Sequence, residues 1–564
     1  MATPPSESNP LSGQSKASSA QESSGKESSG KESSGKETSA SGTSAGLVRA
    51  LGPVIATAVV VGNVIGSGIF LKPGNIAAAS GNFSVIISVW IFGGLLCILG
   101  GLCFAELAAM YPHVGGLYVY LREAYGRWVA FLFGWTEVFF GKPASIGALS
   151  VAFAGSLSLA MGNSLSATAQ VLLAICLIVA MAWVNILGVL WGGRLQLGIT
   201  IVKAAFLALV AFLPFAMIPF VDGTIDVANY STTVKPVHSG LAAQVGVVLL
   251  AVMWAYNGWH GVTPLAAEVK EPHRNIPRAL FVGIGILIVL YIAANFAYHG
   301  VLSMSEMASA GDHAAEKMLE KLFGQRGLAA MAAVIMCSTF GAINTNLLQA
   351  PRITFAMGQD RTFFRSLGSV HATYRTPAFA IVVMATMSVV LVSSVSIAKS
   401  ILNSSETKES ASSDTADRDT ADRDIADRDT AGSDTDEQAS VAMDAYTADK
   451  KPKQLVPMLL ASLRNDTIFS LLTNFVIFSA SIFYMLGVFA VIVLRIRRPD
   501  VERPYRTWGY PIVPVLFLVV YFWFMLQVYR SNPLESRTGL AFIALGVPVY
   551  LAYQYRERRA RRAG

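Results

Sequence analysis

The chain has 564 residues, of which 53% are hydrophobic and only 14% are charged. Soluble domains carry about 25% charged residues, so this composition excludes an ordinary soluble protein. The net charge of +7 does not indicate a nucleic-acid partner, because the arginines gather in alternate loops between apolar runs. We therefore expect an all-α integral membrane protein, with no nucleic-acid partner.

The chain opens with a polar segment. Residues 1–46 are dominated by serine, glycine and charged residues, and the sequence ESSGK occurs three times in succession from Glu22. A segment of this composition cannot bury a hydrophobic core, so we predict a disordered cytoplasmic tail.

Twelve apolar runs follow, each long enough for the roughly 20 residues that a membrane-spanning helix needs. They lie at residues 51–79, 84–110, 128–159, 169–190, 195–220, 241–266, 279–303, 327–358, 377–401, 468–494, 510–529 and 538–555. We assign spans 1–5 to residues 47–221, spans 6–9 to 240–401, span 10 to 467–498 and spans 11–12 to 508–556. Arginine-rich loops alternate with loops that contain few arginines. This alternation predicts a multi-pass protein of the cell membrane with both termini in the cytoplasm.

Two further segments are charged. Residues 402–466, between spans 9 and 10, carry the acidic repeat TADRDTADRDIADRD. The repeat lacks the glycine turn and terminal glutamate of an EF-hand calcium loop, so we predict a disordered, low-complexity insertion on the outer side. Residues 557–564 form a basic cytoplasmic tail, which we interpret as a topology anchor.

Two spans are interrupted by glycine near their middles. Span 1 contains IGSGIF, with Gly66 and Gly68, and span 6 contains MWAYNGWHGVTP, with Gly258, Gly261 and Pro264. The two spans are five apart, so they hold equivalent positions in two five-helix halves, a pattern typical of a transporter site built from inverted repeats. The alternative is that these glycines only allow close helix packing, which explains two matched clusters less well.

An unwound stretch inside a membrane persists only where protein or a polar ligand satisfies its backbone groups. Unwinding span 1 near residues 65–68 frees N–H groups at the start of a half-helix, where an anion is favoured. Unwinding span 6 near residues 255–259 frees carbonyl groups, which accept from a cation such as an ammonium group. An α-amino acid carries both charges, so the two breaks predict a receptor for it.

Longer stretches resemble a known family. They are FAELAAMYPHVGGLYVYLREAYG from span 2, GKPAS in span 3, EVKEPHRNIPRAL after span 6 and STFGAINTN in span 8, together with GSGIF and WAYNGWHG. In this combination the chain resembles the amino acid–polyamine–organocation superfamily, and most of all its L-type branch. The resemblance implies about 12 transmembrane helices in a five-plus-five inverted repeat of the LeuT type, with two extra C-terminal helices.

The resemblance also implies the substrate-binding residues. They come from spans 1, 3 and 6 and are Val64, Gly66, Ser67, Gly68, Ile69, Ser145, Trp254, Ala255, Asn257 and Gly258. Backbone N–H groups of residues 67–69 would bind the substrate carboxylate, and the carbonyl groups of Val64, Trp254 and Asn257 would bind its ammonium group. Trp254 also matches the aromatic residue that covers the bound substrate as a gate.

Span 5 contains one lysine, Lys203, among the apolar residues of LQLGITIVKAAFLALV. An ionisable group inside a membrane is costly and indicates a functional role. Lys203 lies nine residues after Arg194, roughly 13 Å along a helix, which is too deep for easy snorkelling to the interface. The position resembles the lysine whose ammonium group takes the place of sodium in sodium-independent family members, so we predict a coupling role. Exchange and proton coupling stay open alternatives.

The chain departs from the animal L-type pattern at one point. Those transporters are joined to a glycoprotein subunit through a cysteine in the loop after span 3. Here the loop SLSLAMGNSLSA, residues 156–167, contains no cysteine. We therefore expect no disulfide-linked heavy chain, and we make no prediction of the oligomeric state.

The predicted function is secondary active transport or exchange of neutral L-amino acids by alternating access, independent of sodium. In the pocket-lining spans only Glu137 could balance a cationic side chain, and Asn257 is neutral. No basic residue in the outer half of spans 3, 6, 8 or 10 is placed to hold glutamate. The alternatives are a non-transporting amino-acid sensor of this fold and a transporter of cationic amino acids or polyamines. Hydrolase, nucleotide-binding and metal-ligand motifs are absent from the sequence, so we expect no enzyme activity, cofactor or metal, and only the amino acid and the lipid bilayer as partners.

Overall fold

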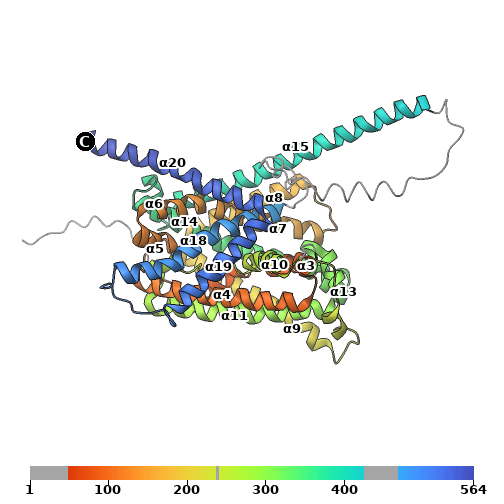
Figure 1. Cartoon of the computed structure of the whole chain (residues 1–564), viewed down its shortest axis with the longest axis horizontal. Helices are drawn as coiled ribbons and strands as arrows, with labels where there is room; N and C mark the ends of the chain where they lie inside the picture. The colour runs from red at the N-terminus through yellow and green to blue at the C-terminus, as the bar shows by residue number, and fades with distance from the viewer. Residues whose placement is uncertain (1–48, 237–239, 425–467, 564) are drawn as a thin grey trace, which may run out of the picture. The chain divides into compact units, whose positions relative to one another are not determined.

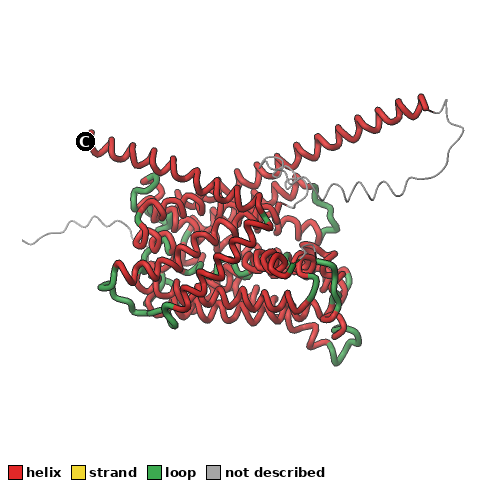
Figure 2. The backbone as a smooth tube through the Cα atoms, viewed as in Figure 1, coloured by secondary structure: helices red, strands yellow, loops and turns green. Residues whose placement is uncertain are grey.

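The structure, a computed structural model, describes residues 49–236, 240–424 and 468–563. Within these ranges the chain is mostly helical and contains no strand, as Figure 2 shows. Eleven helical segments of the described residues are long and apolar enough to cross a membrane, and α10 is a shorter apolar helix. The prediction of an all-α membrane protein is confirmed. The predicted tail at 1–46 falls outside the described residues.

The first repeat contains spans 1–5. Span 1 is divided among α1, α2 and α3, and span 3 runs through α6, the π-helix η1 and α7. The elements of this repeat are α1 (Pro53–Val64), α2 (Gly68–Leu71), α3 (Pro73–Ser80), α4 (Phe83–Met110), α5 (Leu117–Tyr125), α6 (Arg127–Thr136), η1 (Glu137–Gly141), α7 (Lys142–Ala160), α8 (Ala167–Leu187) and α9 (Val189–Met217).

The second repeat contains spans 6–10, and span 6 is divided between α10 and the 3-10 helix η3. Its main elements are α10 (Leu241–Ala255), η3 (Thr263–Glu268), α11 (Pro272–Val301), α12 (Met304–Ala310), α13 (Ala314–Phe323), α14 (Gln325–Gln359), α15 (Ala378–Asp424) and α18 (Ile468–Arg497). Spans 11 and 12 follow as α19 (Ile512–Ser531) and α20 (Pro533–Ala563).

Helices of both repeats pack around the two broken spans. α1 lies against α9 of its own repeat and against α11 and α14 of the second, while α10 packs on α3 and α4 of the first. The long contact between α4 and α11 is visible in Figure 1. Unbroken helices therefore surround both breaks and can supply hydrogen-bonding partners to them, as a membrane interior requires.

The outward faces of the peripheral helices are apolar. On α8, the side chains of Leu172, Val179 and Trp183 are 58%, 56% and 64% exposed, and α19 exposes Val519 and Phe522 in the same way. A soluble protein rarely exposes apolar surface on this scale, whereas lipid acyl chains match it. These faces therefore agree with a position in the bilayer.

Segments that flank the two broken spans are joined at one end of the molecule. Just before α1, the N–H group of Leu51 donates to Glu268 O at 2.9 Å, and Lys270 N–H donates to Leu51 O at 2.9 Å. The Glu268 carboxylate also pairs with Arg352 of α14 at 3.0 Å, and both side chains are 1% exposed. A main-chain bridge and a buried ion pair thus connect span 1, span 6 and span 8.

We expect Glu268→Gln to destabilise the fold, because it leaves the Arg352 guanidinium buried without a counter-charge. Breaking a buried pair from one side costs about 3–5 kcal/mol. Thermal unfolding of the purified protein in detergent measures this loss. Glu271→Gln is the matched control, since the Glu271–Arg274 pair is about two-thirds exposed and such pairs contribute at most about 1 kcal/mol. Equal unfolding temperatures for the two variants would contradict the argument.

The end of α15 differs from the sequence prediction. The helix continues past span 9 to Asp424, into the insertion expected to be disordered from residue 402. In the repeat, Asp414 and Asp419 each precede an arginine by four residues, a spacing that favours a helix. Residues 402–424 are thus described as helix, whereas disorder stays a prediction for the rest of the insertion, which falls outside the described residues.

Candidate substrate site

Span 1 is unwound where its glycines predict. α1 ends at Val64 and α2 begins at Gly68, so residues 65–67 lie outside both helices. The hydroxyl of Ser338 on α14 lies 3.2 and 3.0 Å from two carbonyl oxygens of this break. In α2 the N–H group of Phe70 donates to Ser67 O, three residues earlier, at 3.1 Å. The N–H groups just before it precede the helical ladder and are available to a ligand.

Span 6 is unwound as well. Its α-helix ends at Ala255, and the chain resumes as a 3-10 helix at Thr263. Gly258 has a φ of +93°, a left-handed conformation that glycine accepts readily. A Cβ at this position would lie 2.0 Å from Asn63 Nδ2, the group that donates to Gly258 O at 2.9 Å. The predicted break at 255–259 is confirmed, and it extends as far as η3.

One hydroxyl connects the two breaks. Tyr291, fully buried on α11, lies 2.9 Å from Val64 O and 3.1 Å from Ala255 O. Carbonyl groups at helix ends lack helical partners, so these two need an outside donor. The ends of α1 and α10 therefore share a single donor from span 7.

Span 3 contains a local widening that brings two charged side chains together. η1 is one turn of π-helix, closed by a hydrogen bond from Lys142 N–H to Glu137 O. Pro143 has no N–H group and its ring crowds the carbonyl four residues back, which favours such a widening just before it. Lys142 Nζ lies 3.9 Å from Glu137 Oε2 as a result.

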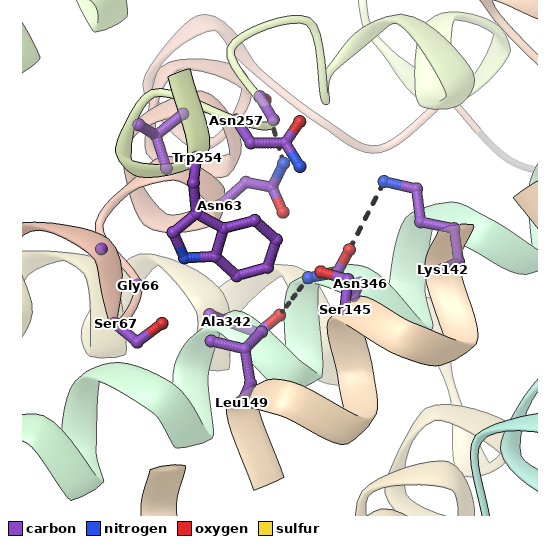
Figure 3. Close-up of a pocket in the computed structure, with 13 residues that line it drawn as sticks. Asn63, Gly66, Ser67, Lys142, Ser145, Leu149, Trp254, Asn257, Ala342 and Asn346 are labelled. Carbon is purple, nitrogen blue, oxygen red and sulfur yellow. Dashed lines mark hydrogen bonds between the residues drawn. The ribbon is translucent and has the colours of Figure 1, made fainter. Parts of the chain in front are cut away.

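The two breaks, span 3 and span 8 enclose a small cavity. In Figure 3 the Trp254 indole lies between Ser67 and the end of the cavity marked by Asn346. The cavity measures about 30 Å³, enough for about two water molecules. An amino acid therefore requires the lining to move. The lining residues are Asn63, Val64, Gly66, Ser67, Gly68, Lys142, Ser145, Leu149, Trp254, Asn257, Gly258, Ala342 and Asn346.

The cavity contains most of the predicted substrate-binding residues. These are Val64, Gly66, Ser67, Gly68, Ser145, Trp254, Asn257 and Gly258. Ile69 and Ala255 are buried but do not line it. Lys203 does not line it either; its side chain is buried and donates to Gly62 O at 2.8 Å, just before the break in span 1.

The remaining lining residues are not among those predicted: Asn63, Lys142, Leu149, Ala342 and Asn346. Lys142 adds to one argument: we considered basic residues only in the outer half of span 3, and this lysine lies near the middle of that span. The cost of a charge inside the membrane, which singled out Lys203, applies equally to Lys142 and could have found it. Lys142 Nζ donates to Asn346 Oδ1 at 3.4 Å (Figure 3).

Two buried polar atoms of the lining have no hydrogen-bond partner within the described residues. They are Ser67 Oγ and Asn63 Oδ1. An unpaired buried polar atom costs free energy, so its position at a cavity indicates a water or a ligand. The Ser67 hydroxyl can donate to a carboxylate, whereas Asn63 Oδ1 can only accept, as it would from an ammonium group.

Comparison with known proteins agrees with this geometry. The family model described as amino acid permease matches residues 51–551. The serine/threonine exchanger SteT of Bacillus subtilis (strain 168) is 28% identical over 517 residues, which cover 91% of this chain and 98% of the relative. The Asc-type amino acid transporter 1 of Mus musculus is 27% identical, over 89% of this chain and 81% of its own. The large neutral amino acids transporter small subunit 2 of Homo sapiens is 26% identical, over 90% and 81%.

These relatives confirm the resemblance to the superfamily and to its L-type branch. The residues that the family model matches include both broken spans, the π-turn of span 3 and the lysine of span 5. The chain belongs to the amino acid permease family.

Proposed function

We propose that this chain is a secondary active transporter or exchanger of neutral L-amino acids that works by alternating access. The observation that carries the proposal is the meeting of both helix breaks at one cavity, with Ser67 Oγ and Asn63 Oδ1 unpaired there. The relatives named above, an exchanger of serine and threonine and a transporter of large neutral amino acids, support the same class of substrate.

The carboxylate of the substrate binds at the start of α2, and its ammonium group binds at the ends of α1 and α10. N–H groups of residues 67–69 and the Ser67 hydroxyl supply donors. The carbonyl groups of Val64, Trp254 and Asn257, together with Asn63 Oδ1, supply acceptors. Backbone groups of the unwound helices bind the carboxylate and ammonium groups that all amino acids share. They therefore select amino acids as a class, and other residues select among their side chains.

Trp254 acts as the gate. Its side chain is buried in the cavity lining, and its ring meets Phe469 of α18 edge-on with the centroids 6.1 Å apart. Because the cavity is too small for an amino acid while the indole occupies this position, rotation of the ring both admits and covers the substrate.

Lys203 replaces a sodium ion and makes transport sodium-independent. Its ammonium group donates to Gly62 O at 2.8 Å, and one turn earlier the Thr200 hydroxyl donates to Ala58 O at 3.0 Å. Span 5 is thereby attached to span 1 immediately before the break. A cation at this position stabilises carbonyl groups that the membrane leaves without water.

In this proposal the protein lies in the cell membrane with both termini in the cytoplasm. The arginine-rich loops support this orientation, since they meet at one end of the molecule: Arg495 pairs with Glu106 at 2.7 Å, and Arg497 donates to Ala124 O. The loop between α7 and α8 has no cysteine, so the chain works without a disulfide-linked heavy chain.

Counterflow in proteoliposomes tests the proposed function. Vesicles that contain the purified chain are loaded with unlabelled serine, and uptake of labelled serine is followed with sodium or with choline outside. We expect accumulation that does not depend on sodium and that leucine, alanine, serine or phenylalanine inhibits better than arginine or glutamate. Absence of counterflow for every amino acid, with binding retained, would instead favour a sensor. A second series with a pH gradient separates exchange from proton-coupled uptake.

A further inference from the structure

We propose that the Glu137–Lys142 pair determines the charge of the side chain that the cavity accepts. In this proposal Lys142 donates to an oxygen on the substrate side chain. Glu137 balances the positive charge of the lysine, so the site prefers a substrate with a neutral side chain. The inference rests on the proposed function and adds a substrate class to it: neutral amino acids with a short side chain that carries a hydrogen-bond acceptor.

The two residues occupy different positions relative to the cavity. Lys142 is the only charged residue of the described chain that lines it. Glu137 does not line it, and its carboxylate lies behind the lysine at 3.9 Å from Nζ. Both side chains are largely buried, at 13% and 10% exposure. Glu137 therefore acts on the substrate only through Lys142, as a positioning residue.

The π-turn creates this arrangement. Residues five apart diverge on an α-helix but are brought together by the i→i+5 bond of η1. Gly141 leaves room for the carboxylate over the turn, because a Cβ at this position would lie 2.9 Å from Glu137 Oε1. The sequence EVFFGKP thus forms a charge pair of which one residue, Lys142, lines the cavity.

Hydrogen-bond donors are concentrated at this end of the cavity. Lys142 has three N–H groups, and within the described residues it makes one hydrogen bond, to Asn346 Oδ1 at 3.4 Å. Asn257 Oδ1 already accepts from the Tyr484 hydroxyl at 2.9 Å, which leaves its Nδ2 group to other partners. Ser145 adds a hydroxyl one turn after the lysine. Donors in this position match a hydroxyl or amide oxygen on the substrate.

The balance of charge explains why the substrate is neutral. A buried cation without a counter-charge is costly, so Lys142 alone would favour a substrate that brings a carboxylate. Glu137, 3.9 Å from Lys142 Nζ, supplies the counter-charge from the protein itself. A cationic substrate is disfavoured because the lysine already occupies the space in front of the only nearby carboxylate among the described residues.

Glu137→Gln tests the inference by competition in the serine counterflow assay. We expect aspartate and glutamate to inhibit the variant at concentrations about tenfold or more below those needed for the wild type. The double variant Glu137→Gln/Lys142→Met carries neither charge, so it should lose this gain and again prefer neutral substrates. If Glu137 had a merely structural role, the variant would take up every substrate more slowly, and the order in which acidic, neutral and cationic amino acids compete would not change.

Lys142→Met is the mirror experiment and keeps the proposal testable if Glu137→Gln fails to fold. It leaves the carboxylate without its partner, so short cationic amino acids should compete better than they do in the wild type, and serine should lose its advantage over alanine. If neither single variant shifts the order of acidic, neutral and cationic competitors, the inference is overturned. Counterflow of serine by the wild type in the same assay tests the proposed function separately.

Discussion

We expect Gly68→Ala to abolish amino acid transport while the protein still inserts into the membrane. A Cβ at this position would lie 2.5 Å from Ala255 Cα and 2.8 Å from Ala255 Cβ. The first of these is backbone, which cannot rotate away, so α2 and the end of α10 must separate. Overpacking of this kind costs about 1–3 kcal/mol, and here the displacement falls on both halves of the site. Uptake of labelled serine into proteoliposomes should drop to the level of empty vesicles.

Gly285→Ala provides the control for this variant. Gly285 lies within α11, and an added Cβ there would meet nothing within 4 Å. Alanine is favoured over glycine in a helix interior by about 0.5–1 kcal/mol, so this variant should transport normally and unfold at the same temperature or slightly above. Normal transport by Gly68→Ala would show that the two broken helices do not need to touch.

We expect Lys203→Met to slow transport strongly or to uncouple it. The substitution keeps the length of the side chain but removes the ammonium group that donates to Gly62 O at 2.8 Å. A hydrogen bond from a charged group contributes about 1.5–3 kcal/mol, so its loss should lower the transport rate by roughly ten- to a hundredfold. Uptake is measured over a range of pH, with and without unlabelled serine inside the vesicles.

Thr200→Val is the matched control, because it removes the neighbouring hydrogen bond from span 5 to span 1 without a change in charge. The Thr200 hydroxyl donates to Ala58 O at 3.0 Å, one helical turn from the lysine. We expect a small decrease in rate with an unchanged pH profile. If Lys203→Met kept the wild-type rate and pH profile, the lysine would have only a packing role.

The sequence was sufficient to predict the spans, the two breaks and most of the cavity lining. Gly66, Gly68 and Gly258 mark the breaks because glycine clusters are costly in a spanning helix unless the helix is meant to unwind. The order of the spans then places the two breaks at equivalent positions of two repeats. The spans and the breaks follow from local composition and from counting, which do not require knowledge of how helices pack, whereas the lining residues were implied by the resemblance to the family.

Contacts between helices were not predictable in the same way. Tyr291 and Ser338 stabilise the breaks from spans 7 and 8, yet each is one of several hydroxyl residues in its span. The rotation of a helix about its axis decides which of them faces the site. Lys142 was overlooked for a related reason: in a regular α-helix it would lie away from Glu137, and only the π-turn before Pro143 brings them together.

The strap formed by Leu51, Glu268 and Arg352 has a kinetic consequence. Because it links chain ahead of span 1 with chain after span 6, neither broken helix can swing outward at this end while the other stays in place. To separate the two segments, three main-chain hydrogen bonds must break: those of Ala50 N–H and Leu51 N–H to Glu268 O, and that of Lys270 N–H to Leu51 O. The Glu268–Arg352 pair meanwhile holds span 8 to span 6. We therefore expect the two broken helices to move together at this end when the carrier turns from one face of the membrane to the other.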